Sequence, residues 1–175
     1  MKMKKQTKST IIFGILLFFA ALIGQRVAHG YIHPADPIVL LAAMLLPTPH
    51  AMIAAGVTGV AVDLIKGLYL LSPATLLVRL LMVLAVRQLL KTKPARKHPE
   101  LMVSIAALVP VPLYYLSEVV NQLIHGQRLA SFRIATITLQ ADLIQAVASI
   151  LLFIFIYDAY KGIQAGREES QKNSQ

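Results

Sequence analysis

The sequence contains no cysteine, and it has few charged residues for a chain of 175. The absence of cysteine excludes disulfide bonds, thiolate metal sites and cysteine nucleophiles. Charged residues make up only 14% of the chain and hydrophobic residues 57%, and the mean hydropathy is +0.66. That balance is too apolar for a soluble domain of this size. The composition therefore predicts a single domain embedded in the lipid bilayer.

Acidic residues are scarce as well, with 8 Asp and Glu against 17 Lys and Arg, so the formal net charge is +9. On one face of a soluble domain, this charge would suggest nucleic-acid binding. Here the basic residues gather in polar patches between apolar runs, at residues 2–8, 87–97 and 161–172. Six membrane crossings place all three patches on one side, and positively charged loops stay in the cytoplasm. We therefore expect both termini to be cytoplasmic and no nucleic-acid partner.

Motifs for catalysis and metal binding are missing too. The sequence has no His-Glu-x-x-His, no Gly-x-Ser-x-Gly and no Gly-rich phosphate loop with its lysine. Its histidines are scattered without the i, i+4 spacing of a helical zinc site, so we expect no metal and no cofactor. We expect a protein that is not an enzyme. A pair of facing intramembrane carboxylates, Asp63 with Asp142 or Glu118, is the one catalytic arrangement left open.

Long apolar runs are what the sequence has instead, and they predict an all-α bundle of six transmembrane helices. The predicted spans are residues 10–28, 38–46, 50–70, 73–90, 101–124 and 134–160. The predicted regions are a basic cytoplasmic tail at 1–9, a membrane domain at 10–162 with a cytoplasmic loop at 91–100, and a polar C-terminal tail at 163–175. Fraying of the last helix is expected from Lys161 onward, because Gly162 and Gly166 are unfavourable in a helix. The first run could instead be a cleavable signal peptide, but Gln25 and Arg26 follow it without a clear cleavage pattern.

Proline positions predict how several of these helices begin or bend. Asp36 before Pro37 is expected to cap the second span, and Ser72 is expected to cap the fourth, with Pro73 at its first helical position. Pro110 and its neighbour Pro112 remove backbone donors and should kink the fifth span near the middle of the bilayer.

A stripe of small residues is expected along one face of the third span. Its members recur every four residues and are Ala51, Ala55, Gly59, Asp63 and Gly67. Small residues let neighbouring helices approach closely, whereas a carboxylate inside the membrane needs a partner or a hydrated cavity. We therefore expect this stripe to form the inner seam of the bundle.

Ionisable side chains lie at a similar depth on several predicted spans. A rise of about 1.5 Å per residue places Arg79, Glu118 and Asp142 about 10 Å below the outer membrane surface, because each lies about two turns from the outer end of its span. Each such group costs roughly 3 kcal/mol or more unless it is paired or hydrated, so a shared cavity is the cheapest arrangement. The residues expected to bind a substrate there are Asp63, Arg79, Glu118, Asp142 and Gln145. The loop from Tyr31 to Asp36 is expected to close over them and to contribute both of those residues to the site.

Structural ion pairs are the alternative explanation for these charges. The pairs would be Asp63 with Lys66, Glu118 with Arg128, and Arg79 with Asp142. Amide side chains occur in the same outer layer and add hydrogen-bonding groups that ion pairs do not require. These amides are Asn121, Gln122, Gln140 and Gln145. Their presence favours a site for a small polar ligand.

Four segments, in this order, resemble the substrate-binding S components of energy-coupling factor (ECF) vitamin transporters. They are GYIHPADPIVLLAAML, AAGVTGVAVDLIKGLYLLSPATLLVRLL, YYLSEVVNQLIHGQRLA and LQADLIQAV. The resemblance covers about residues 10–162 and is nearest to the branch with riboflavin and hydroxymethylpyrimidine S components. Its most specific part is Asp63-Leu64-x-x-Gly67 followed by Ser72-Pro73-Ala74-Thr75. Asp142 stands where the family often has Asn, so the resemblance leaves the vitamin open.

The resemblance implies a protein of the prokaryotic cell membrane that captures a water-soluble vitamin or precursor with high affinity at its outer face. Its implied partners are a transmembrane T subunit and two ATPase subunits, which would hydrolyse ATP. Small residues of the first span would dock on the T subunit, although packing within the bundle is an equal alternative. These residues are Ala20, Gly24 and Ala28. The alternative function is a ligand-free membrane scaffold of the MreD type.

Overall fold

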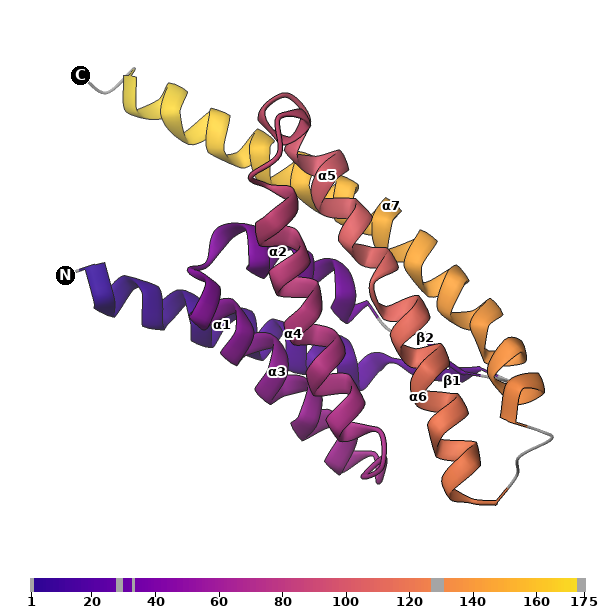
Figure 1. The fold of residues 1–175 in the computed structure, drawn as a ribbon. Coiled ribbons are helices and arrows are strands. Elements are labelled where there is room, and N and C mark those ends of the chain that lie inside the picture. Colours follow the sequence, from indigo (N-terminus) through magenta and orange to yellow (C-terminus); the bar gives the residue numbers. More distant parts are fainter. Residues whose placement is uncertain (1, 28–29, 33, 127–130, 173–175) are drawn as a thin grey trace.

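The computed structural model describes residues 2–27, 30–32, 34–126 and 131–172, and the regular secondary structure of this part is helical except for two short paired strands (Figure 1). The helices are α1 Lys2–Ile23, α2 Ala35–Leu45, α3 Thr48–Ile65, α4 Ser72–Leu89, η1 Pro94–Arg96, α5 Pro99–Ile105, η2 Ala106–Leu108, α6 Pro110–Ile124 and α7 Ser131–Lys172. Strands β1 Gln25–Val27 and β2 Gly30–Ile32 pair antiparallel, with Arg26 opposite Tyr31. Five helical segments are long and apolar enough to cross a membrane, and α2 is a shorter apolar helix beside them. The predicted all-α membrane bundle is confirmed.

The helices form two groups that meet around α2. Helices α1, α3 and α4 pack together, α6 packs along α7, and α2 contacts α1, α3, α4 and α7 (Figure 1). This central position explains why a helix of 11 residues can be so apolar, since Val39, Leu40 and all of its alanines are buried. Leu17, Met82 and Phe153 complete the core from the neighbouring helices.

Part of the small-residue stripe of the third span faces the interior of the bundle, as predicted for an inner seam. Ala51, Ala55 and Gly59 are buried there. A Cβ atom at Gly59 would lie 2.8 Å from Arg79 Cδ on α4, so only glycine permits this spacing. The stripe ends one turn earlier than predicted, because Gly67 adopts φ +73 and Leu68 N–H donates to the Asp63 carbonyl at 2.8 Å. This is the glycine-terminated helix end of a Schellman motif, and it ends α3 at Ile65 rather than Leu70.

Several other helix ends differ from the prediction. The first span ends at Ile23 because the β-hairpin begins at Gln25. Asp36 does not cap α2 but lies in its first turn, and Pro34 occupies the cap position. Similarly, Ser72 is already helical and Leu71 precedes it as the cap residue, since Leu71 and Ser72 N–H both donate to the Leu68 carbonyl. Both helices therefore start one or two residues before the predicted position, and before α4 the preceding turn is already wound.

The last helix is longer than predicted. The expected fraying from Lys161 onward is wrong, because α7 continues through Gly162 and Gly166 to Lys172. Glycine costs only about 1 kcal/mol in a helix interior, which local contacts can offset. One such contact spans Gly162, where Gln164 Nε2 donates to the Tyr160 hydroxyl at 3.0 Å.

The fifth span is broken where proline predicted a kink. Helix α5 ends at Ile105, a 3-10 turn covers residues 106–108, and α6 restarts at Pro110. Pro110 cannot donate to the carbonyl of Ala106, which instead accepts from Val109 N–H at 3.1 Å in the tighter turn. The break turns Ala107 and Pro110 toward the interior of the protein, where they line a cavity.

Membrane topology can be tested by cysteine labelling, because the chain has no native cysteine. Ala95 of the 91–100 loop is only 6% exposed, so the exposed neighbour Lys93 is the better probe. Cysteines at Thr7, Lys93 and Ser170, all exposed, should react with an impermeant thiol reagent only after cell lysis. A cysteine at Tyr69, exposed in the turn between α3 and α4, should react in intact cells. Labelling of Lys93→Cys in intact cells would contradict cytoplasmic placement of this loop.

Candidate ligand-binding cavity

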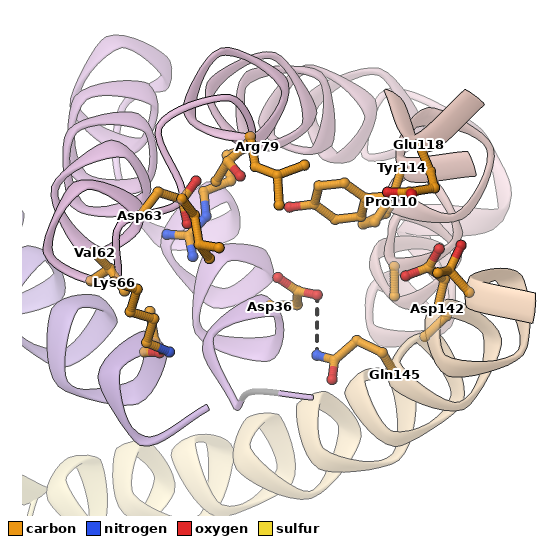
Figure 2. Close-up of a pocket in the computed structure, with 17 residues that line it drawn as sticks. Asp36, Val62, Asp63, Lys66, Arg79, Pro110, Tyr114, Glu118, Asp142 and Gln145 are labelled. Carbon is orange, nitrogen blue, oxygen red and sulfur yellow. Dashed lines mark hydrogen bonds between the residues drawn. The ribbon is translucent and has the colours of Figure 1, made fainter. Parts of the chain in front are cut away.

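A cavity separates α2, α3 and α4 on one side from η2, α6 and α7 on the other (Figure 2). The cavity has a volume of ≈ 140 Å³, counted as the space that the centre of a water molecule can occupy. Its apolar wall includes Val62, Leu71, Ala107 and Pro110. Its polar lining consists of Asp36, Asp63, Lys66, Thr75, Arg79, Tyr114, Glu118, Thr138, Asp142 and Gln145. Carboxylates therefore outnumber cationic groups in the lining.

The side chains predicted to bind substrate lie around this cavity, apart from that of Tyr31. They come from five helices, and they are Asp36, Asp63, Arg79, Glu118, Asp142 and Gln145. Tyr31 belongs to strand β2, but the position of its side chain lies outside the description. Asp36 was expected in a loop over the site, and that expectation is wrong, because the residue lies in the first turn of α2 and forms part of the cavity wall.

Arg79 enters the cavity from α4 and is anchored to α3. The residue is 3% exposed, and Nη1 donates to the Ala55 carbonyl at 3.1 Å and to Thr58 Oγ1 at 3.4 Å. Gly59 provides the room for this arrangement, since a Cβ there would lie 2.9 Å from Arg79 Nε. The alternative of an Arg79–Asp142 ion pair is wrong, because among the described residues the hydrogen bonds of Arg79 go to α3.

A buried hydrogen bond joins α2 and α7 across the cavity wall. Gln145 Nε2 donates to Asp36 Oδ2 at 3.2 Å and lies at the same distance from Ser149 Oγ (Figure 2). Both Asp36 and Gln145 are buried, at 5% and 7% exposed. The hydrogen bond satisfies two polar groups that would otherwise be costly in an apolar bundle.

Two further carboxylates face the cavity from α6 and α7. Glu118 accepts a hydrogen bond from Gln122 at 2.6 Å, one turn along the same helix. Asp142 lies close enough to Asp36 and to Glu118 for its charge to interact with each of theirs. The predicted partner of Glu118, Arg128, lies outside the described residues. This side of the cavity is therefore rich in hydrogen-bond acceptors.

Lys66 is a cavity residue that the sequence analysis considered only as a partner for Asp63. Its side chain interacts electrostatically with Asp63, and its ammonium group also donates to the carbonyls of Ala21 at 2.8 Å and Gly24 at 3.2 Å. These carbonyls lie at the carboxyl end of α1, where a cation compensates the helix dipole. Lys66 thus joins α1 to the α3–α4 turn beside the cavity. Nothing in the sequence indicated this contact, since the partners are backbone atoms of a distant helix.

Tyr114 and Thr75 also line the cavity and were not among the predicted site residues. The Tyr114 hydroxyl interacts with the Thr75 side chain and lies near the charges of Asp36, Asp63 and Arg79. Tyr114 extends from α6 toward α4 across the cavity (Figure 2). Its ring offers an aromatic surface beside the polar groups, an arrangement suited to a planar ligand with polar edges.

The small residues proposed for partner docking do not share one environment. Ala20 is 7% exposed and packs in the bundle core, whereas Gly24 follows the end of α1 and is half-buried. Ala28 lies outside the described residues. A separate face of α1 carries exposed apolar side chains, including Ile12, Leu16, Phe19 and Ile23.

Comparisons with known proteins identify relatives of this fold. The family model of the ECF-type riboflavin transporter, S component, matches residues 4–162. A solved structure titled "Structure and mechanism of the S component of a bacterial ECF transporter" superposes with a TM-score of 0.70. It is 14% identical and covers 93% of this chain and 98% of its own, so the likeness shows the shared fold. No curated protein sequence matches the chain significantly.

Proposed function

The chain belongs to the family of ECF-type riboflavin transporter S components, and from that premise we propose that it captures riboflavin in the cavity beside α2. An S component is the substrate-binding subunit of an ECF transporter. The finer assignment, the vitamin and its place of binding, rests on the chemistry of the cavity. Riboflavin combines a planar heteroaromatic ring with a chain of hydroxyl groups.

The observation that carries the proposal is the convergence of polar side chains inside an apolar bundle. Asp36, Arg79 and Gln145 are nearly fully buried, and each comes from a different helix. Housing ionisable groups at membrane depth costs several kcal/mol, so such residues are usually placed where they act on a ligand or line a hydrated path. Structural pairing alone would not require an open cavity between them.

The lining offers complementary groups for both parts of riboflavin. Tyr114, Val62 and Leu71 provide aromatic and apolar surface for the ring system. Carboxylates and the Gln145 amide can accept or donate hydrogen bonds with the hydroxyl groups of the ribityl chain. The excess of carboxylates over cations disfavours a multiply anionic vitamin such as a folate, and it disfavours a phosphate ester for the same reason.

As an S component, the protein would act with an energy-coupling module. We expect a transmembrane T subunit and two ATPase subunits as partners, with ATP hydrolysis confined to the ATPase subunits. We also expect the complex in the cell membrane of a prokaryote. An MreD-type scaffold needs no ligand cavity, and membership of the transporter family leaves no reason to prefer it.

Binding to the purified protein tests the assignment directly. Riboflavin fluorescence should be quenched saturably on titration with the detergent-solubilised protein, with one site and a dissociation constant below about 1 μM. Thiamine and hydroxymethylpyrimidine are the competitors to test, and neither should displace riboflavin at tenfold excess. Mass spectrometry of the ligand that co-purifies provides an independent check. Absence of quenching together with a different co-purified vitamin would refute riboflavin as the substrate.

A further inference from the structure

Within the described part of the chain, the hydrogen bonds of Arg79 involve only Nη1 of its guanidinium, and they leave the edge formed by Nε and Nη2 available for another partner. A guanidinium carries five N–H donors in a fixed plane, and Nε–H points to the same side as one N–H of Nη2. In this protein Nη1 binds the Ala55 carbonyl and Thr58 Oγ1. Among the described residues, the hydrogen bonds of Arg79 all come from Nη1 and none from Nε or Nη2. The free edge therefore retains contact with the cavity that Arg79 lines.

The backbone of α3 fixes the orientation of this free edge. Anchoring of Nη1 to Ala55 and Thr58 limits rotation of the guanidinium plane. Gly59, on the same helix, packs closely against this side chain, since a Cβ there would approach Cδ to 2.8 Å and Nε to 2.9 Å. Arg79 is thus held before any ligand arrives, which reduces the entropy lost on binding.

We infer that the Nε/Nη2 edge of Arg79 binds two adjacent hydrogen-bond acceptors on the ligand. For riboflavin these would be a ring carbonyl oxygen and the neighbouring ring nitrogen, a pair that the flavin offers on each side of its dione ring. The inference rests on the proposed function, since it concerns the ligand of the same cavity. It assigns Arg79 to the ring, and it leaves the acceptor-rich side formed by Glu118 and Asp142 for the hydroxyl chain.

The test compares riboflavin with lumiflavin, which has the same ring but a methyl group in place of the ribityl chain. Arg79→Lys keeps the charge and removes the two-donor edge. It should weaken binding of both flavins by the same factor, about 10- to 100-fold, because charge-assisted hydrogen bonds are lost. Both affinities are measured by fluorescence quenching on the same detergent-solubilised preparations.

A second variant displaces the side chain of Arg79 while keeping the arginine itself. Gly59→Ala places a methyl group against Arg79 Cδ and Nε, so it should also weaken both flavins equally, by about 3- to 30-fold. Gly56→Ala is the matched control: it lies one turn earlier on α3, and its Cβ would approach Leu76 Cδ1 just as closely, at 2.8 Å, away from the cavity lining. It should leave both affinities unchanged, and thermal unfolding of both glycine variants reports any general loss of packing.

Each outcome distinguishes this inference from the broader proposal. Equal weakening of riboflavin and lumiflavin by Arg79→Lys and Gly59→Ala, but not by Gly56→Ala, supports the assignment. Weakening of riboflavin alone would show that Arg79 binds the ribityl chain and would overturn it. Unchanged affinity in Gly59→Ala, or equal effects of the two glycine variants, would overturn it as well. If the wild type binds neither flavin, the proposed function fails first and this assignment with it.

Discussion

Replacing Asp142 or Glu118 with alanine is expected to weaken riboflavin binding by about 5- to 150-fold. Both carboxylates line the cavity, from α7 and α6, and the charge of Asp142 interacts with those of Glu118 and Asp36. A ligand hydroxyl that loses its acceptor inside a desolvated site costs about 1–3 kcal/mol, which corresponds to this range of affinity. Folding should survive, because removing one of several mutually repelling carboxylates relieves like-charge repulsion.

Asp158→Ala is the matched control for this experiment. Asp158 lies on α7 like Asp142, but it is exposed and far along the helix from the cavity. Its replacement should change neither affinity nor thermal stability. The opposite pattern, in which Asp142→Ala lowers the unfolding temperature while riboflavin affinity stays constant, would show that these charges are structural and that the ligand binds elsewhere.

The arrangement of the cavity residues was largely predictable because they obey a simple energetic rule. An ionisable group in an apolar helix must face other polar groups. The depth of each residue along its span was therefore enough to predict that Asp63, Arg79, Glu118 and Asp142 lie around one cavity. Their individual partners were not predictable from depth. Arg79 binds the backbone of α3, and Lys66 binds the end of α1, and in both cases the acceptors include carbonyls that every residue possesses.

Helix positions followed from apolar runs, but several helix ends did not. The break before Pro110 was foreseen because proline lacks a backbone donor. By contrast, Asp36 and Ser72 resemble helix caps by residue type, yet both already lie inside the first turn of their helices. The persistence of α7 beyond Gly162 depends on contacts such as the Gln164–Tyr160 hydrogen bond, and glycine content alone does not reveal them.

The second large effect is expected at the end of α1, where Gly24→Leu should abolish co-purification with the T subunit. Helix α1 has the smallest buried share of the candidate spans, 17%, so most of its surface is available to lipid or a partner helix. Close approach between helices in a membrane needs small side chains, and a leucine at a half-buried glycine would hold the partner away. Riboflavin affinity should stay nearly constant, since Gly24 does not line the cavity.

Ala20→Leu is expected to prevent co-purification too, but its effect has a second component. Ala20 packs in the bundle core, so the larger side chain would also cost about 1–3 kcal/mol of stability. Gly162→Leu on α7 is the control, because nothing lies within 4 Å of a Cβ at that position. Co-expression with an energy-coupling module, followed by affinity purification and riboflavin titration, separates the two effects. If Gly24→Leu loses riboflavin binding yet assembles normally, the end of α1 belongs to the ligand site through its contact with Lys66, and the T subunit docks on another face.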